Sequence, residues 1–239
     1  MKLNTLFALA AVTGAAMACA SGSGTMASQS ASPTTSASTA TSEWVNLIDP
    51  SLSAWRGYKE QGVPAGWQVV NGDLNKKVSV NDLITKNAYG DFELEWEWKL
   101  PPGGNAGVFY RGNETADKIY WTAPEYQLLD NVEADDNKTP LTRAAAAYGL
   151  YPPPDGHVKP VGEWNLTKIV ANRAHIEHWL NGTKVVEYEL WSPDWLGKVK
   201  ASKFNAWPNY GKAMRGHIAL QGDHRGELAF RNIRIRELP

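Results

Sequence analysis

The run Phe92-Glu93-Leu94-Glu95-Trp96-Glu97-Trp98-Lys99-Leu100 decides the fold class of this chain. Apolar and charged residues alternate along it without a break, and successive side chains of a β-strand point to opposite faces. The run therefore predicts a long strand with one buried face and one solvated face. Pro101-Pro102-Gly103-Gly104 ends the strand with a turn, and residues 106–111 predict a second strand after it.

Shorter segments on both sides of this run repeat the strand pattern. The further predicted strands cover residues 67–70, 83–86, 169–171, 175–180, 184–190, 216–221 and 227–236. Asn181-Gly182 lies between two of them and is the strongest short-range hairpin signal, because both residues tolerate a positive φ. Many short strands separated by turns predict an all-β protein of the sandwich type.

One helix is predicted, over about residues 193–202. Ser192 suits the N-cap, Pro193 suits the first helical position, and Asp194 suits the positive end of the helix dipole. No other segment carries a comparable start signal. The helix is therefore expected to be an addition to the sandwich rather than part of its core.

The first 42 residues predict export rather than a folded domain. Residues 1–18 have the layout of a secretory signal, and Cys19, the only cysteine, follows them directly, which favours lipidation. The rest of residues 19–42 is rich in Ala, Ser and Thr and predicts a flexible tether before a domain over residues 43–239. We therefore expect a cell-envelope lipoprotein, periplasmic or on the outer membrane, that contacts the membrane only through its lipid. Ordinary secretion after cleavage at Ala18 is the alternative.

Charge and aromatic content narrow the class of ligand. The chain has 24 Lys and Arg against 25 Asp and Glu, a net charge of −1, which gives no electrostatic basis for binding nucleic acid. It also has 11 Trp. Exposed Trp faces are common platforms for sugars and other flat ligands, so a carbohydrate is the expected partner.

The run Glu125-Tyr126-Gln127-Leu128-Leu129-Asp130-Asn131 is the first candidate site. As a strand, it places Glu125 and Gln127 on one face. A bulge at the double Leu would turn Asp130 back to that face, where carboxylates suit acid and base chemistry on a sugar. The spacing resembles the catalytic strand of laminarinase-type glucanases, although Gln127 replaces their central Asp. The alternative is a strand edge with solvated acids.

The remaining candidates lie at strand ends and in loops. His178 is either a hydrogen-bonded core residue or a general base. Gln221, Asp223 and His224 follow a strand, and the Asp–His pair can orient an imidazole or hold a metal ion. An acidic loop, residues 130–137, is either solvated or a calcium site. Further candidate sugar contacts are Tyr110, Arg111, Lys159 and Trp164.

In several stretches the chain resembles the 3-keto-disaccharide hydrolase domain family, a group of mostly bacterial exported proteins. The matching stretches, in the order of the family, are residues 89–94, 105–111, 125–131, 159–165, 178–182 and 230–238. The resemblance implies a concanavalin A-like jelly-roll sandwich with a concave sugar-binding face. It also implies cleavage of glycosides whose sugar is oxidised at carbon 3, and a sugar 3-dehydrogenase that supplies them.

A ketone at carbon 3 acidifies the C2 hydrogen, so a base can remove it and expel the leaving group from C1. Such a reaction needs a base, an acid for the leaving oxygen, and a donor or divalent metal ion on the keto oxygen. We expect Glu125 or His178 as the base, with the other or Asp130 as the acid. Gln127, Arg111 and His224 would orient the sugar. The alternatives are a non-catalytic carbohydrate-binding module and an ordinary retaining β-glucanase.

The chain departs from the family at two places. Residues 142–149 hold four consecutive Ala where the family usually has a His and a Gly. The family's Gln-Asp-His-Gly appears here with an additional Gly222 after Gln221.

Overall fold

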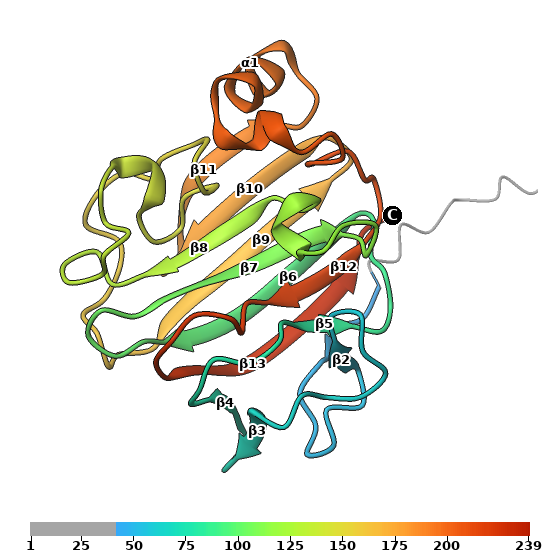
Figure 1. The fold of residues 1–239 in the computed structure, drawn as a ribbon, viewed down its shortest axis with the longest axis vertical. Helices are drawn as coiled ribbons and strands as arrows, with labels where there is room; N and C mark the ends of the chain where they lie inside the picture. Colours follow the sequence, from blue (N-terminus) through green and yellow to red (C-terminus); the bar gives the residue numbers. More distant parts are fainter. Residues whose placement is uncertain (1–41) are drawn as a thin grey trace, which may run out of the picture. The chain divides into compact units, whose positions relative to one another are not determined.

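The computed structural model describes residues 42–239, which form two antiparallel β-sheets packed face to face (Figure 1). The predicted signal, Cys19 and all of the tether except Ser42 lie outside the described residues. None of the helices within residues 42–239 is long and apolar enough to cross a membrane.

The larger sheet contains the strand that decided the fold class. Its strands, in spatial order, are β11 (Thr183–Glu189), β10 (His175–Leu180), β9 (Asn165–Asn172), β6 (Phe92–Lys99), β13 (Leu228–Glu237), β4 (Asp73–Lys76) and β3 (Trp67–Val70), and β1 (Val45–Asn46) pairs with β13. The predicted alternation of β6 is confirmed, since its apolar side chains are buried in the core. Its three Glu side chains bind Arg side chains of β13 on the outer face.

The smaller sheet carries the candidate site. Its strands, in spatial order, are β2 (Trp55–Gly57), β5 (Leu83–Thr85), β12 (His217–Leu220), β7 (Asn105–Gly112) and β8 (Glu125–Leu129). Val108 of β7 and Tyr126 of β8 face the larger sheet and belong to the main core. Glu125 and Gln127 alternate with them, so they point to the other face, away from the larger sheet.

The predicted hairpin and helix are both confirmed. Asn181 and Gly182 have φ angles of 50° and 86° and connect β10 to β11. Helix α1 (Pro193–Ala201) begins at Ser192, whose hydroxyl accepts a hydrogen bond from the backbone N–H of Trp195. The predicted all-β sandwich with one α-helix is therefore the fold of the described residues. Three short 3-10 helices complete it: η1 (Ile119–Trp121), η2 (Pro140–Thr142) and η3 (Lys203–Ala206).

A column of parallel aromatic rings holds the segment after α1 against the sandwich. The rings of Tyr151, Tyr188, Trp195, Tyr210 and Phe204 follow one another with interplanar angles of 6°, 8°, 5° and 6°. Stacked aromatic pairs each add stability beyond the apolar area that they bury. Because Phe204 is the last ring, the column fixes the position of η3, which carries Lys203 beside it.

Candidate functional site

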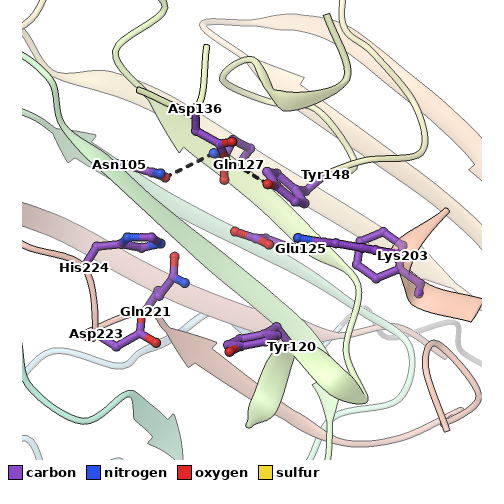
Figure 2. Close-up of a pocket in the computed structure, with 11 residues that line it drawn as sticks. Asn105, Tyr120, Glu125, Gln127, Asp136, Tyr148, Lys203, Gln221, Asp223 and His224 are labelled. Atoms are coloured by element: carbon purple, nitrogen blue, oxygen red, sulfur yellow. Dashed lines mark hydrogen bonds between the residues drawn. The ribbon is translucent and has the colours of Figure 1, made fainter. Parts of the chain in front are cut away.

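A cavity of about 230 Å³ opens on the outer face of the smaller sheet (Figure 2). Its lining residues come from strands β7 and β8, from the loop after β12, and from segments that cover this face. They are Asn105, Tyr120, Glu125, Gln127, Asp136, Tyr148, Lys203, Phe204, Gln221, Asp223 and His224. The lining combines carboxyl, amide, imidazole, ammonium and aromatic groups, which suits a polar ligand with flat faces.

Glu125 is the buried acid of this cavity. Its side chain is only 9% exposed, and burial raises the pKa of its carboxyl to about 8. The charge of Lys203 opposes that shift, and Figure 2 shows the ammonium end of Lys203 pointing toward the carboxylate. Gly107 of β7 lies directly beneath, and a Cβ at this position would overlap the Glu125 carboxylate. Only glycine at 107 leaves room for the carboxyl.

Gln127 shares the face of Glu125, as the sequence predicted. Its amide contacts Asn105 of the neighbouring strand at 3.1 Å. In the amide orientation that pairs donors with acceptors, its NH₂ group donates to Glu125 Oε1 at 3.0 Å and to the Ala106 carbonyl at 3.1 Å. Gln127 thus orients the Glu125 carboxyl and contributes no charge that would alter its pKa.

The four-alanine segment lies along the free edge of β8. The backbone N–H groups of Ala145 and Tyr148 donate to the carbonyls of Gln127 and Glu125, at 2.8 and 3.0 Å. Ala144 to Ala147 are buried, so only small side chains fit there. The Tyr148 hydroxyl donates to Asp136 Oδ2 at 2.9 Å, and burial raises the pKa of this tyrosine. The segment therefore completes one wall of the cavity.

His178 lies in the core of the sandwich and does not line the cavity. Its side chain is 0% exposed, and burial lowers its pKa to about 4, so the ring is neutral. Nδ1 lies 3.0 Å from the Ala145 carbonyl, which can only accept, so Nδ1 carries the proton. Nε2 then accepts from the Tyr110 hydroxyl at 3.0 Å. His178 therefore has a structural role: its hydrogen bond to the Ala145 carbonyl holds that residue, whose φ is 72°.

The predicted bulge at the double Leu is wrong. Strand β8 pairs with β7 in continuous register from Glu125 to Leu129, so Asp130 does not return to the Glu125 face. Its carboxylate accepts from the backbone N–H groups of Gly103 and Val132, at 2.8 and 3.0 Å. Asp130 therefore stabilises the turn after the strand and is not the catalytic neighbour of Glu125 that the spacing suggested.

Two further candidates lie away from the Glu125 cavity. Lys159 lines a second cavity together with Asp130, and its ammonium donates to the Trp164 carbonyl at 3.0 Å. The Trp164 ring is covered by Lys99 and Arg231, at 4.7 and 4.2 Å from its centroid. The structure therefore does not bring these residues to the site.

Tyr110 and Arg111 also lie outside the cavity. Strand β7 is bulged at these two residues opposite Ile218 of β12, and Arg111 has a φ of 53°. Tyr110 enters the core, where its hydroxyl bonds that of Tyr188 as well as His178. Arg111 is 2% exposed, and its guanidinium donates to the carbonyls of Gly90 and Arg173 and to the carboxylate of Asp91. The bulge directs both side chains inward, away from any ligand.

The loop after β12 forms the wall opposite Lys203. Gln221 is 6% exposed, and its Oε1 has no hydrogen-bond partner within residues 42–239; the same holds for Oδ1 of Asp223. Burial lowers the pKa of His224, which favours the neutral ring. The buried Lys76 donates to the His224 carbonyl at 2.6 Å and anchors the loop. The wall therefore brings an amide, a carboxylate and a neutral imidazole to the cavity.

The additional Gly222 has a steric cause. A Cβ at this position would lie 2.6 Å from the backbone oxygens of both Val80 and Asn81. Its own N–H donates to Asp82 Oδ1 at 2.8 Å, and its carbonyl accepts from the Val80 N–H at 3.0 Å. The loop can pack this tightly only with glycine, and the packing sets the positions of Gln221 and Asp223.

Sequence reasoning missed several residues of the cavity. Four predicted site residues line it: Glu125, Gln127, Gln221 and His224. Asp136 and Tyr148 were noted in their segments without being assigned to the site, whereas Lys203 carried no signal in the sequence. Lys203 and Phe204 follow α1. The aromatic column, and the contact of Lys203 Nζ with the Tyr148 ring at 4.4 Å, place them beside β8.

Side chains spaced to hold a metal ion occur at one place in the described part of the chain, His175, Glu177 and Glu187. These residues lie on β10 and β11, and their neighbours Ile176 and His178 point into the core, so the group faces outward on the other sheet. Lys184 bonds both Glu177 and Glu187, at 3.1 and 2.8 Å, so both carboxylates already have a cationic partner.

Three comparisons relate the chain to known proteins. The sequence pattern of the 3-keto-alpha-glucoside-1,2-lyase-like domain matches residues 43–236. A protein of Bacteroides thetaiotaomicron named 3-keto-disaccharide hydrolase is 34% identical over 228 residues, which cover 82% of this chain and 78% of that protein. The motifs that suggested this family are thereby confirmed.

Two crystal structures of candidate glycosyl hydrolases from Parabacteroides distasonis share the fold. One has a TM-score of 0.77 at 29% identity and covers 82% of this chain and 94% of its own. The other has a TM-score of 0.65 at 30% identity and covers 82% and 100%. Both similarities extend over the described sandwich.

Proposed function

Because the chain belongs to the 3-keto-alpha-glucoside-1,2-lyase-like domain family, we propose that this glycoside hydrolase cleaves glycosides whose sugar carries a ketone at carbon 3. The named Bacteroides relative supports this substrate class. The observation that carries the proposal within the structure is the single buried carboxyl of Glu125, with its raised pKa, at the base of a polar cavity.

The raised pKa of Glu125 suits removal of a proton from carbon. A carboxylate with a pKa of about 8 is a stronger base than an ordinary one, and catalytic bases work best with a pKa near the operating pH. An ordinary retaining glycosidase instead needs two catalytic acids. In the glucanase spacing the second acid corresponds to Asp130, which does not line this cavity, and the central Asp is replaced by Gln127. Glu125 is therefore proposed as the base that takes the C2 hydrogen.

The steps balance with one carboxyl group. Glu125 takes the C2 proton, the C1–O bond to the leaving group breaks, and a C1=C2 double bond forms beside the ketone. The protonated Glu125 returns its proton to the departing oxygen on the adjacent carbon. Water then adds at C1, and C2 regains a proton, which gives net hydrolysis. Gln127 holds the carboxyl in position throughout, through its contact with Oε1.

Two sides of the cavity bind the sugar in this proposal. Lys203 offers an ammonium group to the C3 oxygen, which gains negative charge as the C2 proton leaves. On the opposite wall, the side chains of Gln221, Asp223 and His224 line the cavity and bind hydroxyl groups of the sugar.

The test uses phenyl 3-keto-glucoside and phenyl glucoside, each incubated with the purified protein in D₂O. We expect phenol release from the keto compound only, with deuterium at C2 of the released sugar, because elimination exchanges that hydrogen. Release from both compounds without deuterium would indicate an ordinary glycosidase. Saturable binding of the keto compound with no release would indicate a carbohydrate-binding module.

Replacing Lys203 with Met tests the proposed role of its ammonium group as the donor to the C3 oxygen. We expect kcat/KM on the keto compound to fall by about 10²-fold, the size of a lost oxyanion donor. Loss of the positive charge also raises the pKa of Glu125, so the ascending limb of the pH profile of kcat/KM should move to higher pH.

Lys200→Met is the matched control for this variant. Lys200 is exposed on α1, and the substitution removes the same charge from a residue outside the cavity. An unshifted pH profile in Lys203→Met, or an equal shift in both variants, would contradict the assigned role.

A further inference from the structure

The cavity has room for the sugar that reacts and no more. Pockets that enclose drug-sized ligands measure roughly 300–1,000 Å³, whereas the Glu125 cavity measures about 230 Å³. A glycoside also has a leaving group on C1, next to the C2 hydrogen that Glu125 is proposed to take. If the keto sugar fills the cavity, the leaving group must extend beyond the rim.

Three aromatic side chains form a half-buried cluster at this rim: Tyr120 and Trp121 of η1, and Trp207 directly after η3. The Trp207 ring lies 5.8 Å from that of Tyr120 and 6.0 Å from that of Trp121, with an angle of 25° to the latter. It also lies 5.5 Å from the ring of Phe204. Because Tyr120 and Phe204 both line the cavity, the cluster continues the cavity wall outward.

The indole groups of this cluster are free to bind. Within residues 42–239, the indole N–H groups of Trp121 and Trp207 have no protein acceptor, and no Lys or Arg covers their rings. Five other tryptophans do donate: Trp55, Trp67, Trp98, Trp179 and Trp191. Trp44 and Trp164, which are half-buried on the outer face of the larger sheet, are instead covered by Lys and Arg side chains.

We propose that Tyr120, Trp121 and Trp207 form the leaving-group subsite of the enzyme. The subsite takes leaving groups with a flat apolar face, either a pyranose ring or an aromatic alcohol, because such faces stack on the accessible part of aromatic rings. The free indole N–H groups donate to hydroxyls at the edge of a bound sugar ring. This inference rests on the proposed function, since it requires the keto sugar to occupy the Glu125 cavity.

The experiment compares three substrates that share the 3-keto-glucosyl group and differ in the leaving group: methanol, phenol or glucose. We expect a KM about 10-fold lower for the phenyl and glucosyl compounds than for the methyl compound. Trp207→Ala should remove this advantage and leave the KM of the methyl compound within about 2-fold. Trp121→Ala should act in the same direction, and it serves if Trp207→Ala does not fold.

Trp44→Ala is the matched control, because Trp44 is half-buried on the outer face of the other sheet and should not change any of the three KM values. Equal KM values for the three substrates in the wild type would refute the subsite. An equal rise for all three in Trp207→Ala would refute it as well. Cleavage of the methyl compound in those cases would leave the proposed function intact, whereas no cleavage of any keto compound would refute both proposals.

Discussion

Replacing Glu125 with Gln is expected to lower kcat on a 3-keto-glucoside by roughly 10²–10⁴-fold, the usual contribution of a positioned general base. Gln keeps the shape of the side chain above Gly107 and cannot take a proton. The fold should therefore survive while proton transfer is lost. Initial rates of phenol release, with binding of the keto sugar measured by calorimetry, separate a lost chemical step from lost affinity.

The same variant should change how stability depends on pH. The pKa of Glu125 is about 8 in the folded protein and ordinary, near 4.3, in the unfolded chain. The folded state therefore holds the proton more tightly, and its stability falls as pH rises from about 4.3 to 8. Gln does not ionise, so Glu125→Gln should gain Tm relative to the wild type across this range.

Glu163→Gln makes the same substitution at an exposed carboxyl and should leave both the rate and the pH dependence of Tm unchanged. Full activity of Glu125→Gln would refute the assignment of Glu125 as the base. A Tm difference that does not vary with pH would contradict the buried, high-pKa carboxyl itself.

Replacing Arg111 with Met is expected to lower the free energy of unfolding by about 3–5 kcal/mol, as when one partner of a buried ion pair is removed. Arg111 donates to the carbonyls of Gly90 and Arg173, at 2.9 and 2.7 Å, and its guanidinium lies 3.0 Å from Asp91 Oδ1. Met removes the Arg111 donors from both carbonyls and from the Asp91 carboxylate, which keeps only its bond from the backbone N–H of Arg173 at 2.7 Å among the bonds to Oδ1. Urea unfolding measures the loss.

Arg234→Met is the control on the exposed ladder between β6 and β13. Its ion pair with Glu95 is 50% exposed on the arginine side, so its loss should cost less than about 1 kcal/mol. Arg111→Met should leave the KM of the folded fraction unchanged. A stable Arg111→Met protein with a strongly raised KM would instead support the sugar-binding role that the sequence suggested.

Local patterns predicted most of the fold correctly because they depend on near neighbours. The alternation of residues 92–100 requires only that one face of a strand be buried. The hairpin at Asn181-Gly182 requires only two consecutive residues with positive φ. The shortest strands, such as β1 and β2, were missed because two or three residues are too few to show a period.

The candidate site was predicted in part for the same reason. Alternation alone placed Glu125 and Gln127 on one face. It gave no information on whether Asp130 would return to that face, since a bulge depends on the partner strand. The backbone N–H groups of Gly103 and Val132 fix the direction of the Asp130 side chain, and no pattern within the strand predicts these two contacts.

The sequence by itself determined that this chain forms a β-sandwich of a recognisable family, and that Glu125 and Gln127 share a strand face. Only the tertiary structure decided what covers that face. Packing brought Lys203 and Trp207 to the cavity from beyond α1, and it enclosed His178 and Arg111 in the interior. The physical reason is burial. The period of a strand fixes the direction of each side chain. The solvation, pKa and partners of that side chain depend instead on segments that are distant in sequence.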